Sequence, residues 1–202
     1  MSGILDDVPA HIRLQHLVNE AIPFDEAIAR LAEFTAGGVA APIQSIALRY
    51  AEIDAKSIEL WFANVDATMR WPEWPIRSWI VSIQIAIEDD PLEVCHLTIC
   101  GVDTCSPLEI HEDTEAILPP EYDSRETGLD ALYQALQQVE DYETRNDLEY
   151  IHGIGYAALL VKRVLERRQW EMFRGRRVAV IWAGGDGVVV PKHLTNYGGS
   201  AA

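Results

Sequence analysis

The sequence predicts an α+β fold, with N-terminal helices and two C-terminal helices packed on an antiparallel sheet of about five to seven strands and a β-hairpin at the end of the chain. Apolar residues recur at helical spacing near both ends, whereas the middle holds a segment in which apolar and polar residues alternate, as in a strand with one buried face. Because the strands follow one another instead of alternating with helices, we expect them to pair antiparallel.

The length of 202 residues suits a single domain spanning residues 1–202, large enough to bury a core without disulfides. Residues 7–37 are predicted to be helical, with Asp7 as a helix cap and a stop at Gly37 and Gly38. No apolar run approaches the roughly 18 residues of a membrane span, and the first residues do not resemble a secretory signal. We therefore expect a cytoplasmic protein.

Strands are predicted to dominate residues 43–110. The segments IQSIALRYAEI and SIELWFANV are interpreted as a hairpin joined by DAK. A clearer strand follows in SWIVSIQIAIE, where Val81 and Ile83 alternate with Ser82 and Gln84. Between these strands, RWPEWPIRSW holds three tryptophans around two prolines.

The second half is predicted to begin with an acidic loop over residues 106–124 and to be helical over 125–173. Asn146 and Glu149 have the spacing of a capping box, which predicts the start of a long helix. Apolar segments flank an Asp-Gly pair near the end of the chain, so a hairpin is expected over 176–191.

All three cysteines lie in EVCHLTICGVDTC. If this segment forms two strands joined by GVDT, Cys100 lies opposite Cys105 and His96 opposite Glu109. Cys95 then points to the other face, and four residues of strand separate His96 from Cys100 by roughly 13 Å, too far to share one zinc ion. We expect no metal site; the cysteines are interpreted as small buried apolar residues, with a Cys100–Cys105 thiol pair as the alternative.

Few motifs point to catalysis. Glu149 and His152 have the Glu-x-x-His spacing of di-iron bundles, but no second such motif lies on a predicted helix. Gly153 and Gly155 lack the context of a phosphate loop, and they are predicted instead to allow another element to approach closely. No nucleophile elbow occurs. We expect no cofactor and lean away from an enzyme, while a site assembled from residues distant in sequence stays open.

Charge is distributed unevenly along the chain. The formal net charge is -16, and no Lys or Arg occurs between Arg77 and Arg125. Such an acidic field repels nucleic acids and speeds association with basic proteins. Basic residues gather instead on a predicted helix, at Lys162, Arg163, Arg167 and Arg168. This basic stripe is interpreted as a solvated face or as a surface that pairs with the acidic region in a homodimer.

These features favour a binding protein over an enzyme. Tryptophan is enriched at binding hot spots, and carboxylates attract a basic surface. The predicted partner-binding residues are Trp71, Trp74, Glu109, Glu112, Asp113, Glu115, Glu121 and Asp123. In its small size, its acidity and its lack of a disulfide framework, the chain resembles bacterial immunity proteins in general type. This resemblance implies an inhibitor that occludes a basic protein partner such as a toxin nuclease. No nucleic-acid or membrane partner is expected, and a homo-oligomer is possible.

Overall fold

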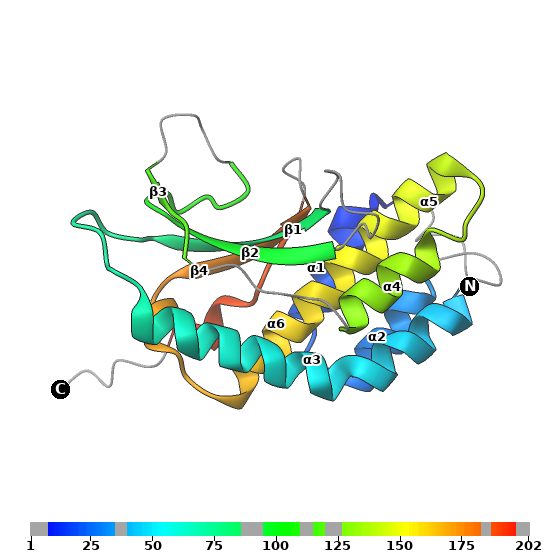
Figure 1. The fold of residues 1–202 in the computed structure, drawn as a ribbon, viewed down its shortest axis with the longest axis horizontal. Coiled ribbons are helices and arrows are strands. Elements are labelled where there is room, and N and C mark those ends of the chain that lie inside the picture. Colours follow the sequence, from blue (N-terminus) through cyan, green and yellow to red (C-terminus); the bar gives the residue numbers. More distant parts are fainter. Residues whose placement is uncertain are drawn as a thin grey trace.

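The computed structural model describes residues 8–34, 40–85, 95–109, 115–119, 127–182 and 187–196. It confirms the α+β class: a five-stranded sheet with the strand order β3-β2-β1-β4-β5 carries a layer of helices (Figure 1). The main core lies between this layer and one face of the sheet. A smaller apolar cluster, built from Ile80, Val102, Ala179 and Ile181, lies on the other face.

Two short helices open the fold, as the sequence predicts. Helix α1 spans Ala10–Asn19 and α2 spans Phe24–Ala32. Pro9 and Pro23 occupy the N-cap positions, and neither helix has a side-chain cap there. Asp7, the expected cap, lies outside the described residues. The two helices draw their buried faces from Leu14, Leu17, Ala27, Ile28 and Leu31.

The predicted hairpin over residues 43–65 is wrong, because this region lies within one long helix. Helix α3 spans Ala40–Thr68, a length of 29 residues. Its buried side chains recur every three or four positions, which is the helical period, at Ile43, Ala47, Ala51, Asp54, Ala55, Ile58, Trp61, Phe62 and Val65. The linking DAK contains neither glycine nor proline, so nothing in it ends a helix.

The sheet is mixed, which corrects the predicted antiparallel arrangement. Strand β1 (Ser78–Ile85) pairs antiparallel with β2 (Cys95–Val102) and parallel with β4 (Arg177–Trp182). A parallel neighbour requires a long crossover connection, and the helices between β2 and β4 provide it. The alternation that predicts β1 is confirmed at Val81 and Ile83, which are both buried in the main core.

The cysteine hairpin is also wrong. Cys100 lies opposite Ile80 of β1, and β2 ends at Val102, before Cys105. The short strand β3 (Ala116–Ile117) pairs with the end of β2 and lies within the predicted acidic loop. The described part of the chain places Glu109 outside the strands, so it does not pair with His96. Cys100 is half-buried and Cys105 exposed, and both thiols are free.

The C-terminal half contains three α-helices. Helix α4 (Gly128–Leu136) has Thr127 as its N-cap, and α5 (Tyr142–Glu149) has Asp141, whose Oδ2 accepts a 2.8 Å hydrogen bond from the backbone N–H of Thr144. The capping box predicted at Asn146 and Glu149 is therefore wrong, because the helix begins four residues earlier, at Tyr142. After a wide π-helical turn, η1 (Tyr150–Ile154), the chain continues as α6 (Gly155–Arg167).

The chain closes with the predicted pair of strands. A short 3-10 turn, η2 (Glu171–Phe173), leads into β4, which pairs antiparallel with β5 (Gly187–Val189). The residues that join them lie outside the described part of the chain. A final 3-10 turn, η3 (Lys192–Leu194), follows β5.

A buried carboxylate ties three helices together inside the helical layer. Asp54 of α3 is 1% exposed. Its oxygens accept hydrogen bonds from the backbone N–H of Gly128, at 2.9 and 3.0 Å, and from the Tyr156 hydroxyl, at 2.7 Å. Burial raises the pKa of Asp54, against the opposing effect of these hydrogen bonds. The carboxylate thus anchors the start of α4 to α3 and α6.

Candidate binding groove

The π-helical turn between α5 and α6 brings two glycines against other elements. A Cβ atom on Gly153 would lie 2.7 Å from the Trp182 ring at the end of β4. A Cβ atom on Gly155 would lie 2.5 Å from Leu31 of α2. The prediction that these glycines allow a close approach is confirmed. They fix the wide turn directly against the sheet and against the N-terminal helices.

The Glu-x-x-His motif does not form a metal centre. His152 is 0% exposed, and burial lowers its pKa to about 4, so its imidazole is neutral at neutral pH. Glu149 Oε1 instead accepts a 2.7 Å hydrogen bond from Gln137 Nε2 and lies 3.7 Å from Arg145 Nε. Within the described ranges, no group of three or more His, Cys, Asp or Glu side chains lies close enough to hold a metal ion.

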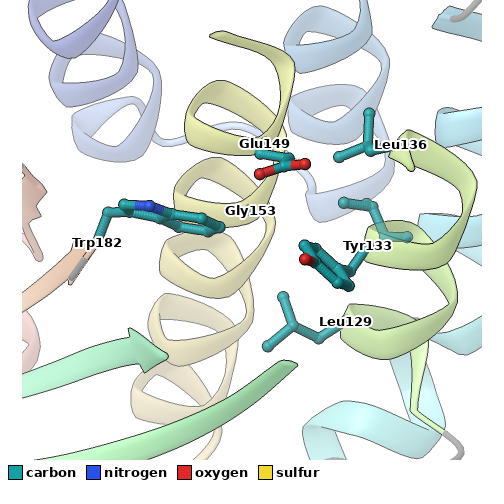
Figure 2. Close-up of a pocket in the computed structure, with 7 residues that line it drawn as sticks. Leu129, Tyr133, Leu136, Glu149, Gly153 and Trp182 are labelled. Carbon is teal, nitrogen blue, oxygen red and sulfur yellow. The ribbon is translucent and has the colours of Figure 1, made fainter. Parts of the chain in front are cut away.

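A small apolar cavity lies between α4 and the π-helical turn (Figure 2). It is lined by Leu129, Leu132, Tyr133, Leu136, Glu149, Gly153 and Trp182. Its volume is about 10 Å³, enough for roughly one water molecule and far below the roughly 300 Å³ at which small-molecule sites begin. In Figure 2 the Trp182 indole extends toward Gly153 from one side, and the α4 side chains face it from the other. The cavity is a packing gap between the Trp182 indole and the apolar side of α4.

A wider groove, here called the acidic groove, shares Trp182 with this cavity. Its volume is about 310 Å³. Its lining comes from α1, α5, the π-helical turn and β4, and consists of Ala10, His11, Asn146, Asp147, Tyr150 and Trp182. Asp147 and Asn146 are exposed on the outer face of α5, as are Glu143 and Tyr142, whose exposed fraction is 68%. Residues far apart in sequence therefore meet at one opening.

The acidic groove has the chemistry of a site for a cationic group. The Asp147 carboxylate accepts charge-assisted hydrogen bonds from an ammonium or guanidinium group. Tyr150 and Trp182 line the same groove, and the faces of aromatic rings attract cations. Sequence reasoning missed this groove because no local motif joins its parts. The available signal was Trp182, a large aromatic residue at the end of an apolar strand.

The basic stripe forms contacts within the chain, and its members Arg167 and Arg168 are exposed, as a solvated face predicts. Arg163 lies 2.8 Å from Glu52 of α3, and Arg167 lies 2.7 Å from the same carboxylate and 3.2 Å from Glu59. Lys162 is buried and donates a hydrogen bond to the backbone carbonyl of Glu20. Arg168 stacks on Trp170, with its guanidinium carbon 3.6 Å from the ring centroid. Arg163 and Arg167 thus join α6 to α3.

The predicted tryptophan anchors lie at the other end of the sheet. Trp71 is 46% exposed, contacts Trp79 edge-on at 6.4 Å, and has the Arg176 guanidinium 5.0 Å from its ring centroid. Trp74 is half-buried against the main core. Trp79 pairs with Val178 near the start of β4, whereas Trp182 ends that strand. The predicted anchors and the acidic groove are thus separate surfaces.

Two of the predicted acidic residues lie at the same end of the sheet as Trp71. Glu109 and Glu115 are exposed, and the Glu115 carbonyl accepts a 3.4 Å hydrogen bond from the backbone N–H of Asp103, just after β2. The end of β2 pairs with Ser78, the first residue of β1. The other predicted acidic residues lie outside the described part of the chain: Glu112, Asp113, Glu121 and Asp123.

Comparisons with family models, with curated proteins and with solved structures gave no match for this chain. Among the described helices, none combines the length and the apolar character needed to cross a membrane.

Proposed function

We propose that this chain is an acidic binding protein that neutralises a basic protein partner by covering its functional surface. The observation that carries the proposal is the acidic groove, where the Asp147 carboxylate and the Trp182 ring meet at a solvent-accessible opening. An immunity protein that blocks a basic toxin, such as a nuclease, is the example of this class that we favour.

The ion pairs of the described residues support a cationic partner. Arg163 and Arg167 are already paired with carboxylates of α3, and Arg145 lies beside Glu149. By contrast, Glu143 and Asp147 on α5 face outward and form no ion pair with a described cation. With a net charge of -16, the outward field favours the approach of a positively charged surface.

Recognition then has two parts. Exposed carboxylates at the far end of the sheet, Glu109 and Glu115 among them, steer the partner during approach. An arginine or lysine side chain of the partner enters the acidic groove, where it pairs with Asp147 and packs on Trp182. Contacts in a groove of this kind control dissociation more than association.

The proposal is tested by affinity capture from a lysate of the source organism, followed by binding measurements on the purified captured protein. We expect a basic protein whose retention weakens with salt, and an affinity at least about tenfold lower for Asp147→Asn. Glu33→Gln, which removes one exposed carboxylate at the end of α2 and outside the groove, is the matched control and should bind like the wild type. Capture of no basic protein, or equal binding by Asp147→Asn, would contradict the proposal.

A small cationic ligand is the second candidate, because the acidic groove is assembled from α1, α5 and β4, as expected for a site built from residues distant in sequence. Calorimetry with arginine amide separates the two functions. A protein partner predicts only weak binding of this isolated group, whereas a dedicated ligand site predicts micromolar affinity or better. Loss of that affinity in Asp147→Asn would place the ligand in the groove.

A further inference from the structure

A second groove, here called the basic groove, has the opposite charge. Its volume is about 210 Å³, and its lining residues are Gln15, Asn19, Arg177, Val189, Val190, Pro191 and Lys192. Arg177 and Lys192 are exposed, and neither forms an ion pair with a carboxylate of the described residues. The chain has a net charge of -16, so its composition alone does not account for an opening lined by two cations and no carboxylate.

The acidic and basic grooves lie at the two ends of one surface. His11 in the acidic groove, and Gln15 and Asn19 in the basic groove, are spaced four residues apart and share one side of α1. Strand β4 connects the same two openings, because Arg177 begins it and Trp182 ends it. The rise of α1 and the length of β4 separate the grooves by about 12 to 17 Å.

The edge of the sheet at the basic groove is closed to strand pairing. The Gln15 side chain donates a 2.7 Å hydrogen bond to the Val189 carbonyl and accepts a 2.8 Å hydrogen bond from the Val189 N–H. These are backbone groups of β5, the strand at the edge of the sheet. Ile12, 39% exposed, lies on the outer side of α1. Anything that docks here does so through side chains and the two grooves.

We propose that this surface binds a second copy of the chain in a two-fold dimer. A two-fold axis through the middle of the surface places the acidic groove of each copy against the basic groove of the other, so the same contact forms twice. Arg177 and Lys192 of one copy then approach Asp147 of its partner, whose Trp182 and Tyr150 rings pack against the same cations. The opposite charges of the two grooves favour a second copy of the chain as the partner.

The affinity between two copies should vary with salt concentration in a different way from the affinity for a basic protein. Two chains of net charge -16 repel each other over the Debye length, about 30 Å at 0.01 M salt and about 8 Å at 0.15 M. The groove contacts act at short range and weaken only when screening becomes much stronger. Dimerisation should therefore be tightest at intermediate salt, whereas binding to an oppositely charged partner should weaken steadily as salt rises.

The proposal is tested on the full chain by sedimentation velocity across a salt series. We expect a dimer that dissociates at least about tenfold more readily in Asp147→Lys and in Lys192→Glu, each of which places like charges at the contact. An equimolar mixture of the two variants should restore dimers, because the lysine introduced in one chain then meets the glutamate introduced in the other. Glu73→Lys and Lys56→Glu make the same kinds of charge change outside both grooves and should dimerise like the wild type.

A wild-type monomer at every salt concentration, or a mixture of the two variants that stays monomeric, would overturn the dimer. So would a dimer unaffected by Lys192→Glu. A second copy and a basic partner compete for Asp147 in the acidic groove, so capture of the partner is measured separately. Lys192→Glu lies outside that groove and releases it from the dimer, so this variant should capture the partner at least as well as the wild type. Failure of the dimer and failure of the proposed function are thereby distinguishable.

Discussion

The Tyr156 hydroxyl donates a 2.7 Å hydrogen bond to Asp54 Oδ2, although the two residues are 102 positions apart in the sequence. The contact joins α3 to α6, and the Gly128 N–H adds the start of α4 to the same carboxylate. The long helix that covers the sheet is thus held by a buried polar contact as well as by apolar packing. A buried carboxylate requires such partners, because an unpaired one is costly.

Removing this carboxylate should loosen the helical layer. We expect Asp54→Ala to lower the free energy of unfolding by about 2 to 4 kcal/mol, because the Gly128 N–H and the Tyr156 hydroxyl lose their buried acceptor. Denaturant unfolding measures the change. Lys56→Ala, two positions away on the exposed side of α3, should shift stability by less than about 0.5 kcal/mol. Equal effects of the two substitutions would show that the buried contact adds nothing.

The buried imidazole of His152 should make stability depend on pH. Burial lowers its pKa from 6.5 to about 4, so the unfolded chain binds a proton in a range where the folded chain does not. Stability from this residue is complete above about pH 6.5 and is lost as pH falls toward about 4, by roughly 3 kcal/mol in all. Unfolding measured across this range should show a shallower slope in His152→Gln. An identical slope in the variant would assign the dependence to other groups.

The contact between Gly153 and Trp182 should be intolerant of a methyl group. A Cβ atom on Gly153 would lie 2.7 Å from the ring, so we expect Gly153→Ala to cost about 1 to 3 kcal/mol and to displace the indole toward the acidic groove. Unfolding and tryptophan fluorescence report the two effects. In a Trp182→Leu background the same change should cost much less, and a double-mutant cycle without this coupling would refute the explanation.

The hydrogen bonds from Gln15 should protect the edge of the sheet. Gln15→Glu keeps the acceptor for the Val189 N–H but loses the donor to the Val189 carbonyl, and it brings a carboxylate close to that carbonyl oxygen. We expect faster amide exchange in β5 and a loss of about 1 to 2 kcal/mol. Asn64→Asp, on the exposed side of α3, controls for the added charge. Unchanged exchange in β5 would mean that the edge does not depend on Gln15.

The two parts of partner recognition should separate in kinetics. Glu109→Gln combined with Glu115→Gln should slow association and flatten its salt dependence, because these exposed carboxylates act at long range. Asp147→Asn should mainly speed dissociation. Surface plasmon resonance with the captured basic protein gives both rates. If the paired Glu substitutions change only dissociation, steering by this end of the sheet is wrong.

The sequence predicts the parts of this fold whose signals are local. Alternation at Val81 and Ile83 predicts β1, and the apolar segments around the Asp-Gly pair predict β4 and β5. Helix α3 escapes prediction because short alternating stretches within it imitate strands, although its buried positions follow the helical period over the full length.

The parallel pairing of β1 with β4 and the acidic groove have no local signal. Both depend on where the chain returns after α4, α5 and α6, and that return is set by packing between distant elements. The two ends of the sheet illustrate the difference. The neighbours of Trp71 in the sequence predict it to be an anchor, whereas Trp182 gains its place in the acidic groove from α1 and α5.

The number of residues in the π-helical turn sets how far α5 is rotated about the helix axis relative to α6. Each residue of an α-helix advances it by about 100°, so deleting one residue from Tyr150–Ile154 would rotate α5 by that angle relative to α6. The apolar side of α6 would keep its place in the core, while Asp147 would turn away from Trp182. Formation of the acidic groove therefore depends on the number of residues in the π-helical turn as well as on the residues that line the groove. A relative with one residue fewer here should lack the groove even if it keeps every residue that lines it.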